Sequence, residues 1–144
     1  MMLVIGYGNP GRCDDGLGPA FVERIAERAL QSVQCITDYQ LKVEHALLLK
    51  GVDRVVFVDA HMSGSAPYTL RSLATADRGD VMSHSLTPEI LLALAETLLD
   101  AVPTAFMLAI RGCEFGCIHE GLSSGATRNL GLAETFFLDW LSKS

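Results

Sequence analysis

The feature that most constrains this chain is a continuous apolar run, RVVFVDA, at residues 54–60. It has the length of one strand, and its four central side chains, Val55 to Val58, are all apolar. Such a run is typical of a strand buried on both faces, which occurs in parallel sheets covered by helices on each side. Two further runs of this kind lie at residues 2–5 and 104–110.

Helical patterns separate these runs. Residues 20–30, AFVERIAERAL, place apolar side chains on one face and charged ones on the other, and Thr87-Pro88 marks the start of another helix. Residues 33–39 read as a further strand, and the alternating residues 67–73, PYTLRSL, read as an edge or antiparallel strand. The pattern predicts one α/β domain over residues 1–144, with three layers (α/β/α) and a mostly parallel sheet.

Composition narrows the possible partners and the location. The chain of 144 residues carries 11 basic and 17 acidic side chains, a net charge of −6, which disfavours nucleic acid as a partner. Its most apolar region, residues 90–110, is interrupted by Glu96, Asp100 and Pro103, so we expect no membrane span. The N-terminus shows no secretory signal, and four cysteines among 49% hydrophobic residues do not resemble a disulfide scaffold. We therefore expect a cytoplasmic protein.

Acidic residues recur where the predicted strands end. Asp14 and Asp15 follow the first strand after a glycine-rich turn, Asp38 ends the second and Asp59 ends the third, while His84 precedes a helix. Ligand sites in such sheets form beyond the carboxyl ends of the strands. Converging carboxylates would repel one another, and a divalent cation such as Zn, Ni, Mn or Fe would relieve that repulsion. The turn therefore presents carboxylates and does not receive a phosphate.

Each of these residues also has an ordinary structural interpretation. Asp15 is a possible cap for the helix that begins near Gly18, and Asp14 either does the same or is solvated. Asp38 is a possible turn former and His84 a surface-loop histidine. Asp59 is harder to explain in this way, because an acid at the end of a buried strand should have a partner.

Three further groups have weaker signals. Cys113, Cys117 and His119 form CEFGCIH, whose spacing is not that of a standard zinc pair, so we expect ordinary thiols there. His45 and His61 are expected at the surface. No His-Glu-x-x-His helix and no recognisable serine or cysteine nucleophile is present.

Several segments together resemble one enzyme family. GYGNPGRCDDGLG, DYQLKVEHALLL, VVFVDA and SHSLTPEILL are similar, in order and spacing, to the hydrogenase maturation endopeptidases. That resemblance implies a twisted sheet of five strands, one of them antiparallel. It also implies removal of a C-terminal extension from the precursor of a nickel–iron hydrogenase large subunit after nickel insertion.

The resemblance further implies a set of site residues. Asp15, Asp59 and His84 would contact the metal, and Asp15, Asp38 and Asp59 would act in catalysis, with Asp38 either activating water or selecting the metal. The nickel would be supplied by the nickel-loaded precursor, and another divalent cation can occupy the site in the isolated protein. Some family members have glutamate where this chain has Asp15.

Two other classes remain open on the sequence alone. Peptidyl-tRNA hydrolases also begin with a strand and a GNPG turn, but they continue with Thr-Arg-His-Asn where this chain has RCDD at residues 12–15. A non-enzymatic nucleotide-binding module would use the glycine spacing of Gly6, Gly8 and Gly11. Pro10 removes one N–H donor from that turn, and the two aspartates that follow would oppose a pyrophosphate.

Overall fold

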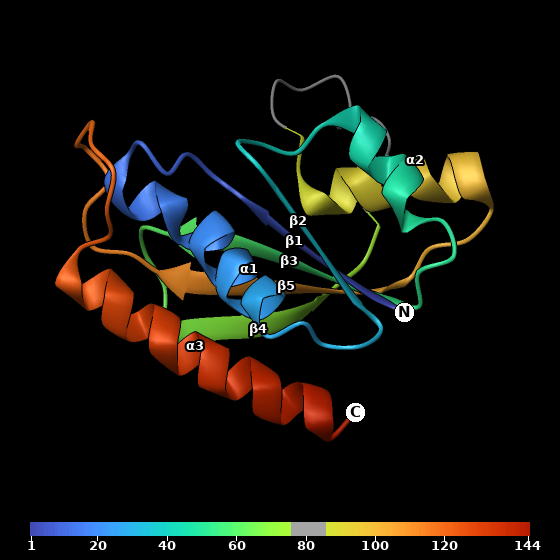
Figure 1. The fold of residues 1–144 in the computed structure, drawn as a ribbon. Helices are drawn as coiled ribbons and strands as arrows, with labels where there is room; N and C mark the ends of the chain where they lie inside the picture. Colours follow the sequence, from blue (N-terminus) through green and yellow to red (C-terminus); the bar gives the residue numbers. More distant parts are fainter. Residues whose placement is uncertain (76–85) are drawn as a thin grey trace.

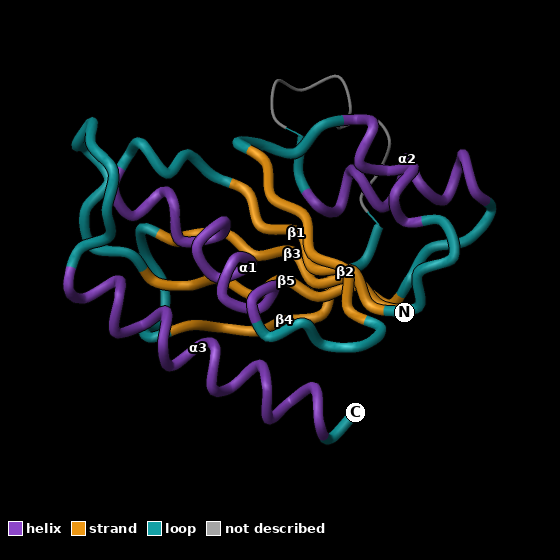
Figure 2. The backbone as a smooth tube through the Cα atoms, viewed as in Figure 1, coloured by secondary structure: helices purple, strands orange, loops and turns teal. Residues whose placement is uncertain are grey.

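The computed structural model of the protein describes residues 1–75 and 86–144. Figures 1 and 2 show a central sheet between helices. The strands are β1 (Met2–Tyr7), β2 (Val33–Asp38), β3 (Arg54–His61), β4 (Tyr68–Leu73) and β5 (Thr104–Arg111). The helices are α1 (Leu17–Glu27), α2 (Pro88–Leu99) and α3 (Ser124–Ser142), with 3-10 helices η1 (Cys13–Gly16) and η2 (Val43–Leu49).

The sheet has the strand order β2-β1-β3-β5-β4. β2, β1, β3 and β5 are parallel to their neighbours, and β4 pairs antiparallel with β5 at the edge. This confirms the predicted mostly parallel five-stranded sheet and the antiparallel reading of residues 67–73. The parallel strands bring their carboxyl ends to one edge, which is where the sequence predicts the site.

Each face of the sheet has its own apolar core. On one face, helices α1 and α3 cover side chains such as Val4 and Val56. The rings of Phe21 and Phe137 pack edge to face there, with their centroids 5.4 Å apart. On the other face, η2 and α2 cover a second cluster that includes Phe57. Figure 1 shows these helices on opposite sides of the sheet, so the predicted three layers are confirmed.

The glycines of the first turn allow α1 to pack close to the sheet. A side chain on Gly18 would lie 2.6 Å from the carbonyl oxygens of both Tyr7 and Val58. Gly8 has a φ of +143°, in a region that favours glycine. Close helix–strand packing, rather than space for a ligand, therefore explains the glycine at position 18.

Two predicted helices differ in detail. The first ends at Glu27, because Ala29 turns into the left-handed region at φ +49°, so the pattern to residue 30 overstates its length. The helix expected at residues 43–51 is a 3-10 helix. The predicted N-cap of α2 is confirmed, since the Thr87 hydroxyl accepts the N–H of Ile90 at 3.2 Å. Across residues 1–75 and 86–144, no helix is long and apolar enough to cross a membrane.

Candidate active site

Three polar side chains align where the first three parallel strands end. Asp38 on β2 is the register partner of Tyr7 on β1. On the other side of β1, Gly6 pairs with Val58, so Asp59 on β3 occupies the next position beside Tyr7. Because side chains alternate along a strand, all three lie on the face that η2 and α2 cover.

Of the aspartates at this sheet edge, Asp59 has the most strongly shifted pKa. Burial, and to a smaller extent the nearby charge of Asp15, raise its pKa to about 7, against the opposing effect of the hydrogen bond from the N–H of Ala60 to Oδ1 at 2.8 Å. The Asp59 carboxyl group is therefore close to half-protonated at neutral pH. A carboxyl group with this pKa is well suited to proton transfer or to binding a cation.

Asp15 lies close enough to Asp59 for its charge to act on it. Its Oδ2 accepts the backbone N–H of Asn9 at 2.7 Å, which fixes the carboxylate across the glycine-rich turn. Helix α1 has no side-chain cap, so the capping interpretation of Asp15 and of Asp14 is wrong. The structure thus brings together two of the three predicted metal-contacting residues.

The third predicted residue, His84, lies outside the described residues. Its part in a shared site with Asp15 and Asp59 therefore stays a prediction.

Tyr7 lies beside Asp59, and the charges of Glu89 and Arg71 also act on it; the sequence did not single out these three residues. Burial raises the pKa of Tyr7 far above its usual value, with the charges of Asp59 and Glu89 adding to the shift and Arg71 opposing it. Arg71 on β4 and Glu89 on α2 are 3.8 Å apart as an ion pair. In the sequence Tyr7 directly follows the first predicted strand, but only the strand register shows that it lies between Asp38 and Asp59.

Asp38 is held by its own local partners. Its Oδ2 lies 3.2 Å from Lys42 Nζ and 3.3 Å from His45 Nε2, and the N–H of Tyr39 donates to Oδ1 at 2.7 Å. Burial raises the pKa of Asp38, but the Tyr39 hydrogen bond and Lys42 outweigh it and hold the pKa below its usual range. Its catalytic role stays a prediction.

The surface assignment of His45 is wrong. It is 5% exposed, and its Nδ1 accepts the N–H of Lys42 at 2.9 Å while its Nε2 faces Asp38. The surface assignment of His61 agrees with its exposed side chain.

Asp14 does not share the site with its neighbour Asp15. It is fully buried, and its two oxygens accept hydrogen bonds from the N–H groups of Cys113, Glu114 and Ser123 and from the Ser123 hydroxyl, at 2.7–2.8 Å. Burial raises the pKa of Asp14, but these donors outweigh it and keep the pKa below its usual range. The expectation that Asp14 is solvated or caps a helix is wrong: it fastens the turn to the segment that precedes α3.

The glycine-rich turn has no backbone donors left for a phosphate. Every N–H between residues 8 and 15 already donates to an acceptor within the chain. The donors are Gly8, Asn9, Gly11, Arg12, Cys13, Asp14 and Asp15. Phosphate-binding turns need free N–H groups that point at the ligand. This geometry argues against the nucleotide-binding alternative and supports the carboxylate-presenting interpretation of the turn.

The cysteines differ from the prediction of ordinary thiols. The sulfur atoms of Cys13 and Cys117 are paired as a disulfide between residues 104 positions apart, so the prediction is wrong for Cys117. Cys113 is a free, exposed thiol, as expected, and Cys35 is also free.

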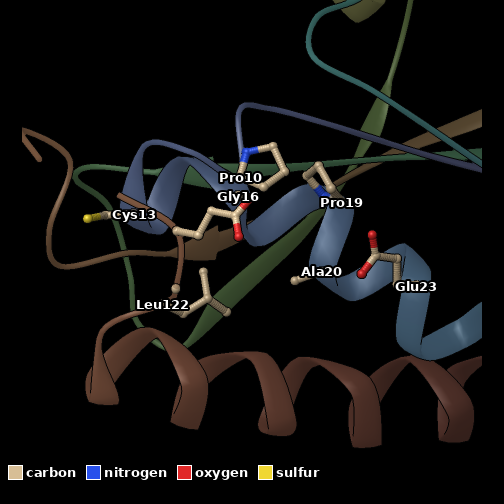
Figure 3. Close-up of a pocket in the computed structure, with 9 residues that line it drawn as sticks. Pro10, Cys13, Gly16, Pro19, Ala20, Glu23 and Leu122 are labelled. Carbon is tan, nitrogen blue, oxygen red and sulfur yellow. The ribbon is translucent and has the colours of Figure 1, made fainter. Parts of the chain in front are cut away.

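A pocket of about 260 Å³ lies beside α1 and does not coincide with the acids. Its lining is Pro10, Cys13, Gly16, Pro19, Ala20, Glu23 and residues 120–122. Figure 3 shows Pro19, Ala20 and Glu23 on one side of it, with the Cys13 sulfur pointing away from them. Of the predicted site residues that the structure describes, Asp15, Asp38 and Asp59, none lines it.

This fold and its strand-end acids can be set beside known proteins. The sequence matches no protein-family model and no curated relative. Solved structures match over nearly the whole chain. One is a [NiFe] hydrogenase maturation protease, HycI, from Thermococcus kodakarensis KOD1, with 22% identity, a TM-score of 0.71, and 94% of this chain and 88% of that chain covered.

Another is the hydrogenase maturating endopeptidase HybD from E. coli, with 21% identity, a TM-score of 0.69, and 99% and 92% of the two chains covered. A hydrogenase 2 maturation peptidase from Thaumarchaeota archaeon SCGC_AB-539-E09 has 21% identity and a TM-score of 0.69 over 99% of both chains. At these identities the likeness establishes the fold. The chain therefore has the α/β fold of the hydrogenase maturation proteases.

Proposed function

We propose that this protein is an endopeptidase that removes the C-terminal extension of a nickel–iron hydrogenase large-subunit precursor. The observation that carries the proposal is the pair Asp15 and Asp59 at the sheet edge, where burial, with a smaller contribution from the charge of Asp15, raises the pKa of Asp59 to about 7. The shared fold with hydrogenase maturation proteases supports the choice of substrate.

Asp59 has the protonation behaviour that peptide hydrolysis requires. The reaction needs a base that takes a proton from water and an acid that gives one to the departing amine. A carboxyl group with a pKa of about 7 can do either near neutral pH. The hydrogen bonds that Asp15 and Asp59 accept from Asn9 and Ala60 keep both carboxylates in place.

The same pair fits a cation that arrives with the substrate. Two interacting carboxylates repel each other, and a divalent cation held between them would remove that cost. Oxygen and imidazole donors are compatible with nickel. We infer that the nickel of the loaded precursor contacts Asp15, Asp59 and His84, and that this contact positions the scissile bond beside the carboxylates.

The test compares nickel-loaded and nickel-free precursor, each incubated with the purified protein and followed by mass spectrometry. The nickel-loaded precursor should lose its C-terminal extension, and the nickel-free precursor should not. Equal cleavage of both would refute recognition through nickel but leave the peptidase role intact. Failure to cleave either would contradict the peptidase role itself.

A matched pair of variants assigns the activity to the site. Asp59→Asn keeps the size of the side chain and removes its charge, so cleavage should fall about 100-fold or more, as for loss of a group that acts on the reacting atoms. Asp139→Asn makes the same change on an exposed residue of α3 and should cleave normally. The melting temperature of Asp59→Asn should equal or exceed that of the wild type. Full cleavage by Asp59→Asn, or its unfolding, would count against the role of Asp59.

A further inference from the structure

A second cluster of possible metal ligands lies apart from the carboxylate pair. Ligand atoms of Cys13, Cys117 and His119 all lie within 4.8 Å of one another. In residues 1–75 and 86–144, no other group of three cysteine, histidine or acidic side chains meets this criterion. Cys13 comes from η1, and the other two come from the loop between β5 and α3.

The spacing is close to what a tetrahedral ion needs. Zinc binds sulfur at about 2.3 Å and nitrogen at about 2.0 Å, which places its ligand atoms about 3.5 Å apart. His119 Nε2 already lies 3.2 Å from Cys13 Sγ, and the Cα atoms of the two cysteines are 6.0 Å apart. Small side-chain adjustments would therefore enclose an ion.

The histidine is oriented as a ligand would be. Its Nδ1 lies 3.1 Å from the carbonyl oxygen of Glu120, which can accept the Nδ1 hydrogen. In that tautomer Nε2 keeps its lone pair, and of the two ring nitrogens Nε2 lies nearer the Cys13 sulfur, at 3.2 Å against 3.5 Å for Nδ1. Metal-binding histidines usually have this second hydrogen bond, because it fixes both the ring and its tautomer.

The backbone holds the two halves of the cluster together. The N–H of Cys13 donates to the carbonyl of His119 at 3.0 Å, and the buried Asp14 binds Cys113, Glu114 and Ser123 on either side of the loop. Cys13 itself has a φ of +54°, a conformation uncommon outside glycine. The fold thus brings the three side chains together before any ligand binds.

We propose that the reduced pair Cys13 and Cys117, together with His119, forms a site for Zn²⁺ with one coordination position open. Thiolates are soft donors and imidazole is a borderline one, and together they favour zinc-like ions over Mg²⁺ or Ca²⁺. Cys13 is buried, Cys117 is half-buried and His119 is exposed, so the fourth position faces solvent. The inference is independent of the proposed peptidase function.

The disulfide is the metal-free form of this site. A dithiol reductant supplies two electrons and two protons, becomes a disulfide itself, and leaves two thiols on the protein. A bound Zn²⁺ then displaces those two protons to solvent, because only thiolates bind the metal. Metal binding and the disulfide therefore exclude each other.

The experiment titrates Co²⁺, a spectroscopic substitute for zinc, into the full chain after reduction and removal of the reductant. One equivalent should bind and produce thiolate-to-cobalt charge-transfer absorption, which one equivalent of Zn²⁺ then abolishes. The oxidised protein should show none. Absence of the absorption in the reduced protein, or equal binding by the oxidised protein, would overturn the proposal.

Variants identify the ligands without depending on cleavage. Cys117→Ser and His119→Gln lie in the loop and should each weaken cobalt binding about 100-fold or more. Removing a residue that only supports a metal ligand already weakens binding by about 10- to 100-fold, and these residues are the proposed ligands themselves. Cys113→Ser changes an exposed thiol four residues away and should bind normally, as should Asp59→Asn. Equal loss in Cys113→Ser would show that the ligand set is wrong, and loss in Asp59→Asn would place the metal at the carboxylates instead.

Thermal stability gives a second measurement. An ion that binds only the folded state stabilises it, so Zn²⁺ should raise the melting temperature of the reduced wild type and of Cys113→Ser by several degrees. It should leave His119→Gln unchanged. An equal rise in His119→Gln would refute the role of the histidine.

Discussion

Two regions of this protein bury aspartates and shift their pKa values in opposite directions. Where the turn meets the segment before α3, Asp14 accepts four hydrogen bonds, and its pKa lies below its usual range. At the sheet edge, Asp59 accepts one hydrogen bond beside a like charge, and its pKa rises to about 7. Burial disfavours the charged form in both regions, so the number of donors decides the outcome.

The comparison separates an anchoring acid from a reactive one. Asp14 is charged and accepts four hydrogen bonds, which hold together two segments that lie far apart in the chain. Asp59 accepts only one hydrogen bond and is close to half-protonated at neutral pH, so a bound proton or cation would lower the free energy of its carboxylate form. Adjacent residues belong to the two regions, since Asp15 takes part in the second.

The largest effect is expected from Asp14→Ala. The change leaves three N–H groups and a hydroxyl buried without their acceptor, so the free energy of unfolding should fall by about 3–5 kcal/mol. Urea unfolding monitored by circular dichroism measures this. Asp15→Ala is the control and should cost less than about 1.5 kcal/mol, because Asp15 accepts one hydrogen bond. Equal losses in the two variants would remove the distinction between the regions.

A smaller effect should appear in the pH dependence of stability. With a folded pKa of about 7 and an unfolded value near 4, Asp59 holds a proton in the folded state that the unfolded chain has lost. Its contribution to stability is therefore full below about pH 4 and declines as pH rises to about 7. Between pH 5 and 8 this loss should amount to about 3 kcal/mol.

Asp59→Asn should lack this loss, because the amide does not titrate. The measurement is the free energy of unfolding of both proteins at several pH values, and their difference removes the contribution of the histidines. Parallel curves for the two proteins would show that Asp59 has an ordinary pKa.

The smallest effect concerns the coupling between the two carboxylates. Asp15→Asn should lower the pKa of Asp59, since it removes a repelling charge, but the pKa should stay above its usual range, because burial is the larger cause. Carbon-13 NMR of the Asp59 carboxyl group follows this titration directly. A pKa that stays unchanged or rises in Asp15→Asn would mean that the two carboxylates do not interact.

Sequence patterns predicted the fold of this protein but not the separate roles of its neighbouring aspartates. The apolar runs and helical periods predicted the layers, the parallel sheet and its antiparallel edge, because burial on one or both faces leaves a local signature. The same strands predicted which edge carries the acids. Sequence spacing did not distinguish Asp14 from Asp15, because their partners lie about a hundred residues away or within the same turn.

The sequence by itself determined the order of strands and helices and the chemistry available at the ends of the strands, since both depend on neighbouring residues. Only the tertiary structure decided which acids are satisfied. It gave Asp14 its donors from the segment before α3, gave Asp38 its partners Lys42 and His45, and brought Cys13 to Cys117 and His119. The physical reason is that hydrogen bonds and metal ligation act over a few ångströms in space, whatever the separation along the chain.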